Sequence, residues 1–176
     1  MLQLVSEGGM PVAASVRSIA RRAGVTEAVL YRYFPNKDAM FREVWDSTLA
    51  PMVEEKRQLL AAAESSAVDT LRSWIEISYR HFDQDPAAFH YVFLSEGTAT
   101  WRSDPSYGVQ SALLKAWLET HVDAAAIAPL SHERACDYFV SIMLSVPRRI
   151  RLGKLEGPAS THTAEALTVA QRLLGL

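Results

Sequence analysis

Two short helical patterns separated by a single glycine most constrain how this chain can fold. In residues 16–23, apolar side chains recur at i, i+3, i+4 and i+7, which predicts a helix with one buried face. Gly24 follows where a helix commonly ends in the left-handed conformation. Thr26 can cap a second helix, which Pro35 should end, because the residue before a proline disfavours helical geometry. Two helices joined by so short a turn predict a helix-turn-helix.

The outward face of the second helix combines small, aromatic and charged side chains. Leu30 and Phe34 are four residues apart and are predicted to point inward. The same spacing leaves four residues facing outward: Glu27, Ala28, Tyr31 and Arg32. Such a face suits a DNA major groove, because arginine can bridge guanine acceptors, alanine can contact a thymine methyl group and tyrosine can reach a phosphate.

The formal net charge of −2 conceals an uneven distribution. Residues 15–37 contain five basic residues and one acidic residue, whereas residues 46–176 contain 12 basic and 16 acidic residues. Arg17 and Lys37, the latter at the start of a helix that Asn36 caps, are placed to contact base edges or phosphates. We call the basic N-terminal part the head and the acidic remainder the body. This distribution of charge predicts that only the head binds a polyanion. The alternative is an ordinary helical hairpin whose exposed residues only keep it soluble.

The segment SVRSIARRAGVTEAVLYRYFPNKDAMF, residues 15–41, resembles the DNA-binding domain of the TetR family of transcriptional regulators. Its most specific parts are IARRAGVT, LYRYF and the lysine just after the proline. The resemblance implies an all-α fold, with a three-helix helix-turn-helix domain over residues 1–46 (motif 15–34) and a helical effector-binding and dimerisation domain over residues 47–176. It also implies a homodimer on palindromic double-stranded operator DNA, controlled by a small-molecule effector.

The resemblance implies DNA contacts at ten positions. Bases would be contacted by Arg17, Glu27, Ala28, Tyr31, Arg32 and Tyr33, and phosphates by Ser15, Thr26, Val29 (through its backbone), Tyr31 and Lys37. Three features depart from the family: a carboxylate at Glu27, the loss of a frequent threonine at Val29, and a chain that begins where family members are already in their first helix. We therefore expect a shortened N-terminus. These departures motivate an alternative function, a helical small-molecule-binding or scaffold protein whose DNA-binding head does not work.

The rest of the chain is predicted to be helical, because no alternating Val/Ile/Thr run indicates a strand. Pro51 is expected to end or restart the helix that begins at Lys37. Residues 107–122 are apolar nearly all round, which predicts a central buried helix. The polar face of residues 67–83 predicts a solvent-exposed ion-pair ladder, formed by Arg72, Glu76, Arg80 and Asp83.

Aromatic residues in the body could line an apolar effector cavity, which would favour a hydrophobic or aromatic ligand. They are Trp74, Tyr79, Phe89, Phe93, Trp101 and Trp117, and core packing is the alternative for each. His81, His90 and His121 could add polar contacts.

Two apolar stripes near the C-terminus predict a dimer interface, since family members pair their terminal helices. The stripes comprise Phe139, Ile142, Met143, Val146, Ile150, Leu167, Ala170 and Leu174. The alternative is that they complete the core of one chain.

Several classes of function are disfavoured by what the sequence lacks. No histidine or cysteine pair has metal-ligand spacing, and no nucleophile elbow, phosphate loop or dinucleotide fingerprint occurs. The lone Cys136 suits a reducing compartment, and no uncharged run reaches the roughly 18 residues of a membrane span. We therefore predict a cytoplasmic DNA-binding regulator without catalytic activity, cofactor or metal, acting as a repressor that a small ligand releases from its operator.

Overall fold

The computed structural model describes residues 20, 24–62, 66–94 and 108–176, and every regular element in this part of the chain is a helix. The all-α prediction is thus confirmed. The elements are α3 (Glu27–Tyr33), α4 (Lys37–Ala61), α5 (Ala67–Gln84), α6 (Pro86–Phe93), α7 (Val109–His121), α8 (His132–Arg151), the 3-10 helix η2 (Ala159–His162) and α9 (Thr163–Leu174).

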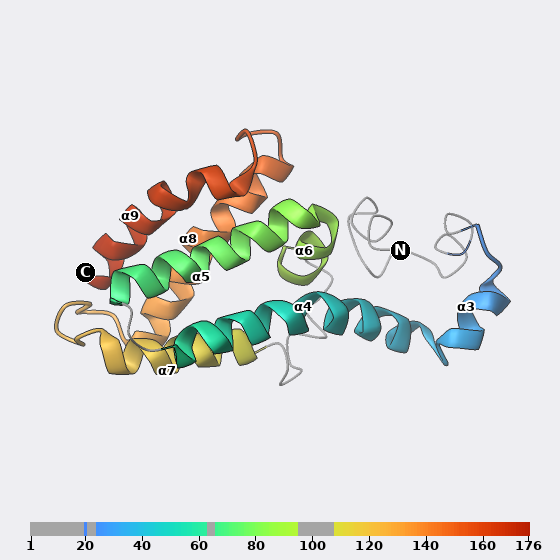
Figure 1. The fold of residues 1–176 in the computed structure, drawn as a ribbon, viewed down its shortest axis with the longest axis horizontal. Helices are drawn as coiled ribbons and strands as arrows, with labels where there is room; N and C mark the ends of the chain where they lie inside the picture. Colours follow the sequence, from blue (N-terminus) through green and yellow to red (C-terminus); the bar gives the residue numbers. More distant parts are fainter. Residues whose placement is uncertain (1–19, 21–23, 63–65, 95–107) are drawn as a thin grey trace.

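The long helix α4 links two parts of the molecule that differ in size (Figure 1). Helices α5 to α9 gather around its C-terminal half, whereas α3 lies at the opposite end, away from that body. Helix α5 is central to the body, since it packs against α4, α6, α8, α9 and η2. Helix α7 packs against both α8 and α4.

The turn before α3 has the local structure that the sequence predicts. Gly24 has a left-handed backbone with φ of 68°, a conformation that glycine adopts at little cost. The Val29 backbone N–H donates to Thr26 Oγ1 over 3.3 Å, which caps α3. Phe34 is already extended, so α3 ends before Pro35 as expected.

The prediction that Pro51 ends the fourth helix is wrong. Helix α4 continues through this proline for 25 residues, from Lys37 to Ala61. A proline inside a helix costs about 3 kcal/mol, because it removes one backbone hydrogen bond and crowds the preceding turn. Leu49, Met52 and Val53 are all buried around it, and burying three such side chains contributes more than this cost. Tertiary packing therefore keeps α4 continuous.

Helix α5 buries the face that its periodicity predicts. Leu71, Trp74, Ile75, Ser78 and Phe82 are all buried, with exposed fractions of 3% or less. Glu76 on the opposite face is exposed, as expected.

Two residues of the ion-pair ladder predicted along α5, Arg80 and Asp83, bind partners on other elements instead. Arg80 pairs with Glu55 of α4, and His81 Nε2 lies 2.9 Å from the other oxygen of the same carboxylate. Asp83 accepts hydrogen bonds from the backbone N–H groups of Ala159 (2.6 Å) and Ser160 (3.0 Å) at the start of η2. These contacts attach α5 to α4 on one side and to η2 on the other.

Helix α7 is not buried on all sides, so that prediction is also wrong. Leu114, Trp117 and Leu118 are buried, but Ser111 and Glu119 are exposed on the other face, and so is Ala112. Alanine is a strong helix former whether or not it is buried. Counting alanine among the buried residues therefore overestimated how much of this helix is covered.

Candidate DNA-binding head and effector body

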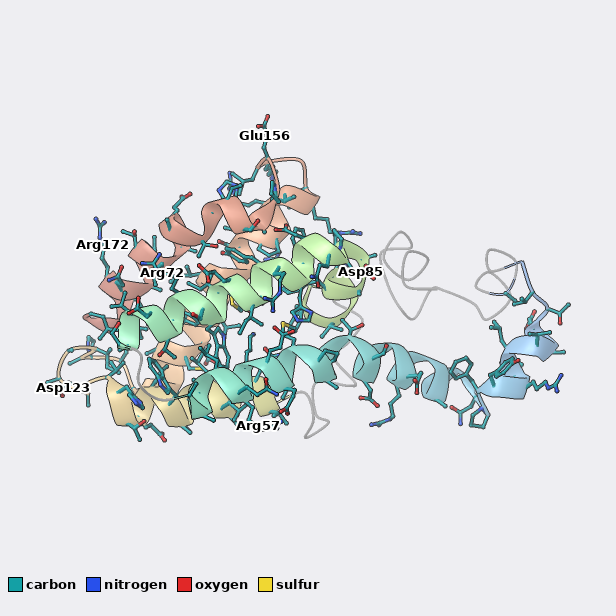
Figure 2. All side chains as sticks on the ribbon, viewed as in Figure 1. Arg57, Arg72, Asp85, Asp123, Glu156 and Arg172 are labelled. Atoms are coloured by element: carbon teal, nitrogen blue, oxygen red, sulfur yellow. The ribbon has the colours of Figure 1, made fainter. Side chains whose placement is uncertain are left out.

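Helix α3 presents an exposed face of the predicted composition. Leu30 is buried and Phe34 packs against the core, so the inward-facing residues are those expected. Ala28 and Arg32 are exposed on the opposite side, and Glu27 is partly exposed beside them. Figure 2 shows the side chains of α3 projecting at the end of the molecule farthest from the body.

Large apolar side chains are exposed on this segment more often than elsewhere. Eight such side chains are exposed in the described part of the chain, and half of them occur within nine residues: Val25, Val29, Tyr31 and Tyr33. Tyr33 is the most exposed, at 72%. Single exposed apolar residues are ordinary, but a cluster of them usually marks a contact surface. Tyr31 precedes Arg32 and Tyr33 follows it, so exposed aromatic groups flank a cation in this segment of the chain.

The structure describes only some of the remaining residues predicted to contact DNA. Ser15 and Arg17 lie outside the described residues. Lys37 is the first residue of α4, whose N-terminus Asn36 caps by accepting from the Ala39 N–H over 2.8 Å. Thr26 uses a lone pair to cap α3, and its hydroxyl hydrogen remains able to donate to a phosphate.

The five described members of the predicted effector-binding set lie in different side-chain contacts. On α5, Trp74 lies against Lys56 of α4, whereas the pKa of the Tyr79 hydroxyl is raised by burial and by the charge of Glu165 on α9. These two residues therefore face different neighbours. The other described members are buried or half-buried in separate aromatic contacts, Phe89 against Phe82 and Phe93, and Trp117 stacked on His121. Trp101 lies outside the described residues.

The three histidines named as polar contacts also lie apart. His121 Nδ1 is 2.9 Å from the Trp117 carbonyl oxygen, within its own helix. His81 belongs to the Glu55 pair described above. The Nδ1 atom of His90 is buried and has no hydrogen-bond partner among the described residues. Burial together with the charge of Arg151 lowers the pKa of this imidazole to about 4.

A small cavity of about 180 Å³ lies between α4, α5 and α6. Its lining includes Pro51 and Met52 of α4 and Ala88 and Phe89 of α6. Volumes of this size suit a small organic group rather than a large ligand. Two predicted effector residues thus border cavities: Phe89 lines this one, and Phe93 lines a cavity of about 610 Å³ between α6 and α8.

The structure also reveals a buried lysine that the sequence analysis missed. Lys56 on α4 is 1% exposed, with its Nζ atom 2.6 Å from Gln110 Oε1 of α7 and 4.5 Å from the ring centroid of Trp74. Burial lowers the pKa of this ammonium to about 7, opposed by the charge of Glu55. A signal was present, because Leu49, Met52, Val53 and Lys56 follow the i, i+3, i+4, i+7 spacing of a buried face.

The predicted interface residues on α8 and α9 fall into two groups. Phe139, Leu167, Ala170 and Leu174 are at most 3% exposed within this single chain, so they pack in its core. Met143 and Val146 are also buried, and Ile142 and Ile150 are more exposed than these core residues.

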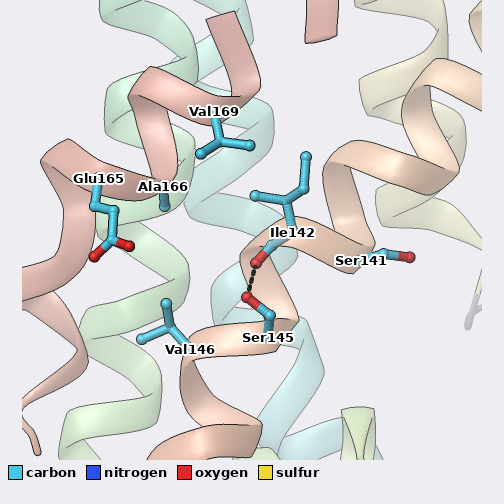
Figure 3. A pocket seen from close by; sticks show the side chains of 7 residues that line it. All are labelled: Ser141, Ile142, Ser145, Val146, Glu165, Ala166 and Val169. Carbon is cyan, nitrogen blue, oxygen red and sulfur yellow. Dashed lines mark hydrogen bonds between the residues drawn. The ribbon is translucent and has the colours of Figure 1, made fainter. Parts of the chain in front are cut away.

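Between the two helices lies an apolar groove of about 380 Å³ (Figure 3). Ile142 and Val146 face it from α8, while Ala166 and Val169 face it from α9.

Comparison with known proteins identifies the head. Residues 2–44 match the family model described as bacterial regulatory proteins, tetR family. The chain carries the TetR DNA-binding domain. Of that domain, the structure describes α3 and the start of α4, so the resemblance of this segment to the family's DNA-binding domain is confirmed.

Solved TetR-like structures share the fold of nearly the whole chain. FadR from Bacillus subtilis in complex with stearoyl-CoA is 14% identical, with a TM-score of 0.77 over 99% of this chain and 95% of its own. FadR from Bacillus halodurans, a fatty acid degradation regulator, is 16% identical with a TM-score of 0.76 over 99% and 95%. PfmR from Thermus thermophilus is 19% identical with a TM-score of 0.72 over 98% and 93%. At these identities the likeness concerns the fold alone.

No curated protein matches the chain. Within the described ranges, none of the helices has the length and apolarity to cross a bilayer, and no cluster of three potential metal-ligating side chains occurs.

Proposed function

We propose that this protein is a cytoplasmic transcriptional repressor that binds a palindromic operator as a homodimer and leaves it when a small molecule occupies the helical body. The observation that carries the proposal is the exposed surface of α3, on which Tyr31 and Tyr33 flank Arg32 in the chain and Val29 is also exposed. These groups suit contacts with base edges, thymine methyl groups and phosphates. The DNA contacts would come from the ten positions predicted above.

Helix α4 is the proposed link between ligand and DNA. Its 25 residues span about 37 Å at 1.5 Å per residue, and its N-terminal half leaves the body toward α3. We place the boundary between head and body inside this helix, near residue 46. A ligand that favours one position of α4 would change where the recognition helix lies. A coupling of about 1–3 kcal/mol would change operator affinity by about 5- to 150-fold.

The α8–α9 face is the proposed dimer surface. The apolar groove there is flanked by exposed Val169, which is 45% exposed in the single chain. Covering such a face with a second copy would bury apolar area, and a two-fold axis would set two α3 helices about 34 Å apart for successive major grooves.

The effector is proposed to be a small apolar molecule. The B. subtilis FadR structure, which shares the fold, holds stearoyl-CoA, a ligand with a long apolar chain. Phe89, Met52 and Ala88 around the described cavity offer apolar contacts of the same kind. Because the fold is shared at low identity, we carry over only the apolar character of the ligand.

Fluorescence anisotropy tests the proposal directly. The full chain is titrated onto labelled DNA taken from beside its own gene, over a salt series and with unrelated DNA as competitor. We expect competitor-resistant binding whose affinity falls steeply with salt, because several phosphate contacts release counterions. Weak binding that is equal for both DNAs would instead favour the alternative function, a small-molecule-binding protein with an idle head.

A further inference from the structure

Three helices of the body bring hydrogen-bond donors together at one buried point. Lys56 comes from α4, Trp74 from α5 and Gln110 from α7, and they are 1%, 2% and 9% exposed, respectively. The Lys56 ammonium lies 2.6 Å from Gln110 Oε1 and 4.5 Å from the ring centroid of Trp74. Because their positions in the chain are far apart, only the tertiary structure assembles this cluster, which we call the donor cluster.

The donor cluster has more donors than acceptors. An ammonium has three N–H groups, and Gln110 Oε1 is the single acceptor bonded to Lys56 among the described residues. Gln110 Nε2 and Trp74 Nε1 are buried donors without any partner in the described structure. Buried donors are normally paired, so several unpaired donors at one point require an explanation.

The positive charge of the donor cluster is also uncompensated. Glu55 is adjacent in sequence, but its two oxygens are engaged by Arg80 and His81 of α5. No carboxylate in the described part of the chain forms an ion pair with Lys56. A buried cation is unfavourable unless it is paired, which is why the pKa of Lys56 is lowered. A partner that supplied both negative charge and acceptor atoms would stabilise the ammonium form.

We propose that the donor cluster binds the carboxylate of a small organic acid whose apolar part lies between α4, α5 and α6. A carboxylate has two oxygens with about four acceptor sites, enough for Lys56, Gln110 and Trp74 together. Its charge would compensate the ammonium, which a neutral acceptor could not do. This inference rests on the proposed function, because it names the chemical class of the effector.

The cavity between α4, α5 and α6 is the place we propose for the apolar part of the acid, although none of the three donor residues lines it. Its apolar lining is Pro51, Met52, Ala88 and Phe89, beside the polar residues Ser47, Thr48, His81, Gln84 and Asp85. The 180 Å³ cavity is lined by Met52, which lies one helical turn before Lys56 on the same face of α4. A methionine side chain is flexible enough to swing aside and join such a cavity to a polar cluster. The cavity volume fits a medium-length chain or a single substituted ring. Binding would then act on α4 itself, the helix that continues to the DNA-binding head.

Calorimetry with matched acids and esters tests this site on the full chain. Decanoate and 4-butylbenzoate are each compared with their methyl esters, which keep the apolar part and remove the charge. We expect at least one acid to bind tenfold or more tightly than its ester. Lys56→Met should remove that preference, while the exposed control Lys154→Met should retain it. Equal binding of each acid and its ester, or an unchanged preference in Lys56→Met, would overturn the proposal.

Gln110→Glu provides a second variant that does not depend on removing the lysine. It places a carboxylate beside Lys56 with almost no change in shape, so it should raise the unfolding temperature and block binding of the acids. A lower unfolding temperature together with intact binding would contradict the inference.

DNA binding measured in parallel separates this inference from the proposed function. If the chain binds no DNA, the repressor proposal fails, but calorimetry still decides whether the acid site exists. If the operator is released by decanoyl-CoA and by neither free acid, the repressor proposal stands and the carboxylate site is wrong.

Discussion

The head and the body differ in how far their candidate binding residues are exposed to solvent. On α3 the informative side chains are exposed, with Tyr33 at 72% and Arg32 beside it. In the body the most informative group, Lys56, is 1% exposed and is surrounded by three helices. A surface that meets a large partner must be presented outward, whereas a site for a small molecule must exclude water. The two regions therefore call for different experiments.

The largest effect is expected from truncating the core of the body. Phe139→Ala should lower the free energy of unfolding by about 3–5 kcal/mol, because Phe139 is 1% exposed and its removal leaves a cavity. Urea denaturation at several protein concentrations measures this loss. The matched change on the outer side of α9, Val169→Asp, should weaken dimerisation and alter the stability of the separated chain by less than about 0.5 kcal/mol. A similar loss in both variants would contradict the division between core and surface.

Removing the cation from the head should have the next largest effect. Arg32→Ala should weaken operator binding by about 1–3 kcal/mol if the guanidinium bonds a guanine, and it should leave the unfolding free energy nearly unchanged. Fluorescence anisotropy gives the affinity. Arg72→Ala provides the control, because Arg72 is exposed on α5 in the body. Equal effects of the two substitutions would show that charge alone, rather than the face of α3, supports binding.

The buried lysine predicts a pH dependence that the head should lack. The pKa of Lys56 is lowered from 10.5 to about 7 in the folded chain, so between these values the unfolded chain binds more protons. Stability should therefore rise with pH above about 7, by up to about 1.4 kcal/mol per pH unit, and should gain nothing from this group below that pH. Urea denaturation from pH 6 to pH 9 measures the slope. The slope attributable to this lysine should disappear in Lys56→Met, and a slope that persists would assign the effect to other groups.

The smallest effect is expected at the cap of the recognition helix. Thr26→Ala removes the side-chain acceptor for the Val29 N–H, which should destabilise α3 by about 1 kcal/mol. Hydrogen exchange should speed up in α3 and remain unchanged in the body. Thr168→Ala on α9 is the control, because its hydroxyl donates to the Ala164 carbonyl within a helix and caps nothing. Faster exchange throughout the chain would mean that head and body unfold together.

The sequence predicts the beginning and end of α3 well because these depend on near neighbours. Gly24 adopts the left-handed conformation, Thr26 caps α3 and the residue before Pro35 ends it, and each effect acts within about four residues. The inward positions of Leu30 and Phe34 follow from the same short periodicity. The family resemblance depends on this segment too, and the family model matches it over residues 2–44.

The candidate sites of the body could be predicted only as a list of residue types. Trp74 and Tyr79 are both aromatic and lie on one helix, yet one faces Lys56 and the other lies toward α9. Phe139 and Val169 both belong to helices with an apolar stripe, yet one is core and the other is exposed. Periodicity identifies a face without saying which element covers it.

By itself, the sequence determined the helix-turn-helix, its caps and the all-α class, because local hydrogen bonding and backbone conformation decide them. Only the tertiary structure decided that α4 runs through Pro51, that one face of α7 is uncovered and that Lys56 meets Gln110 at 2.6 Å. Each of these outcomes depends on contacts between residues distant in the chain. Packing free energy summed over such contacts exceeds the local preferences that oppose it.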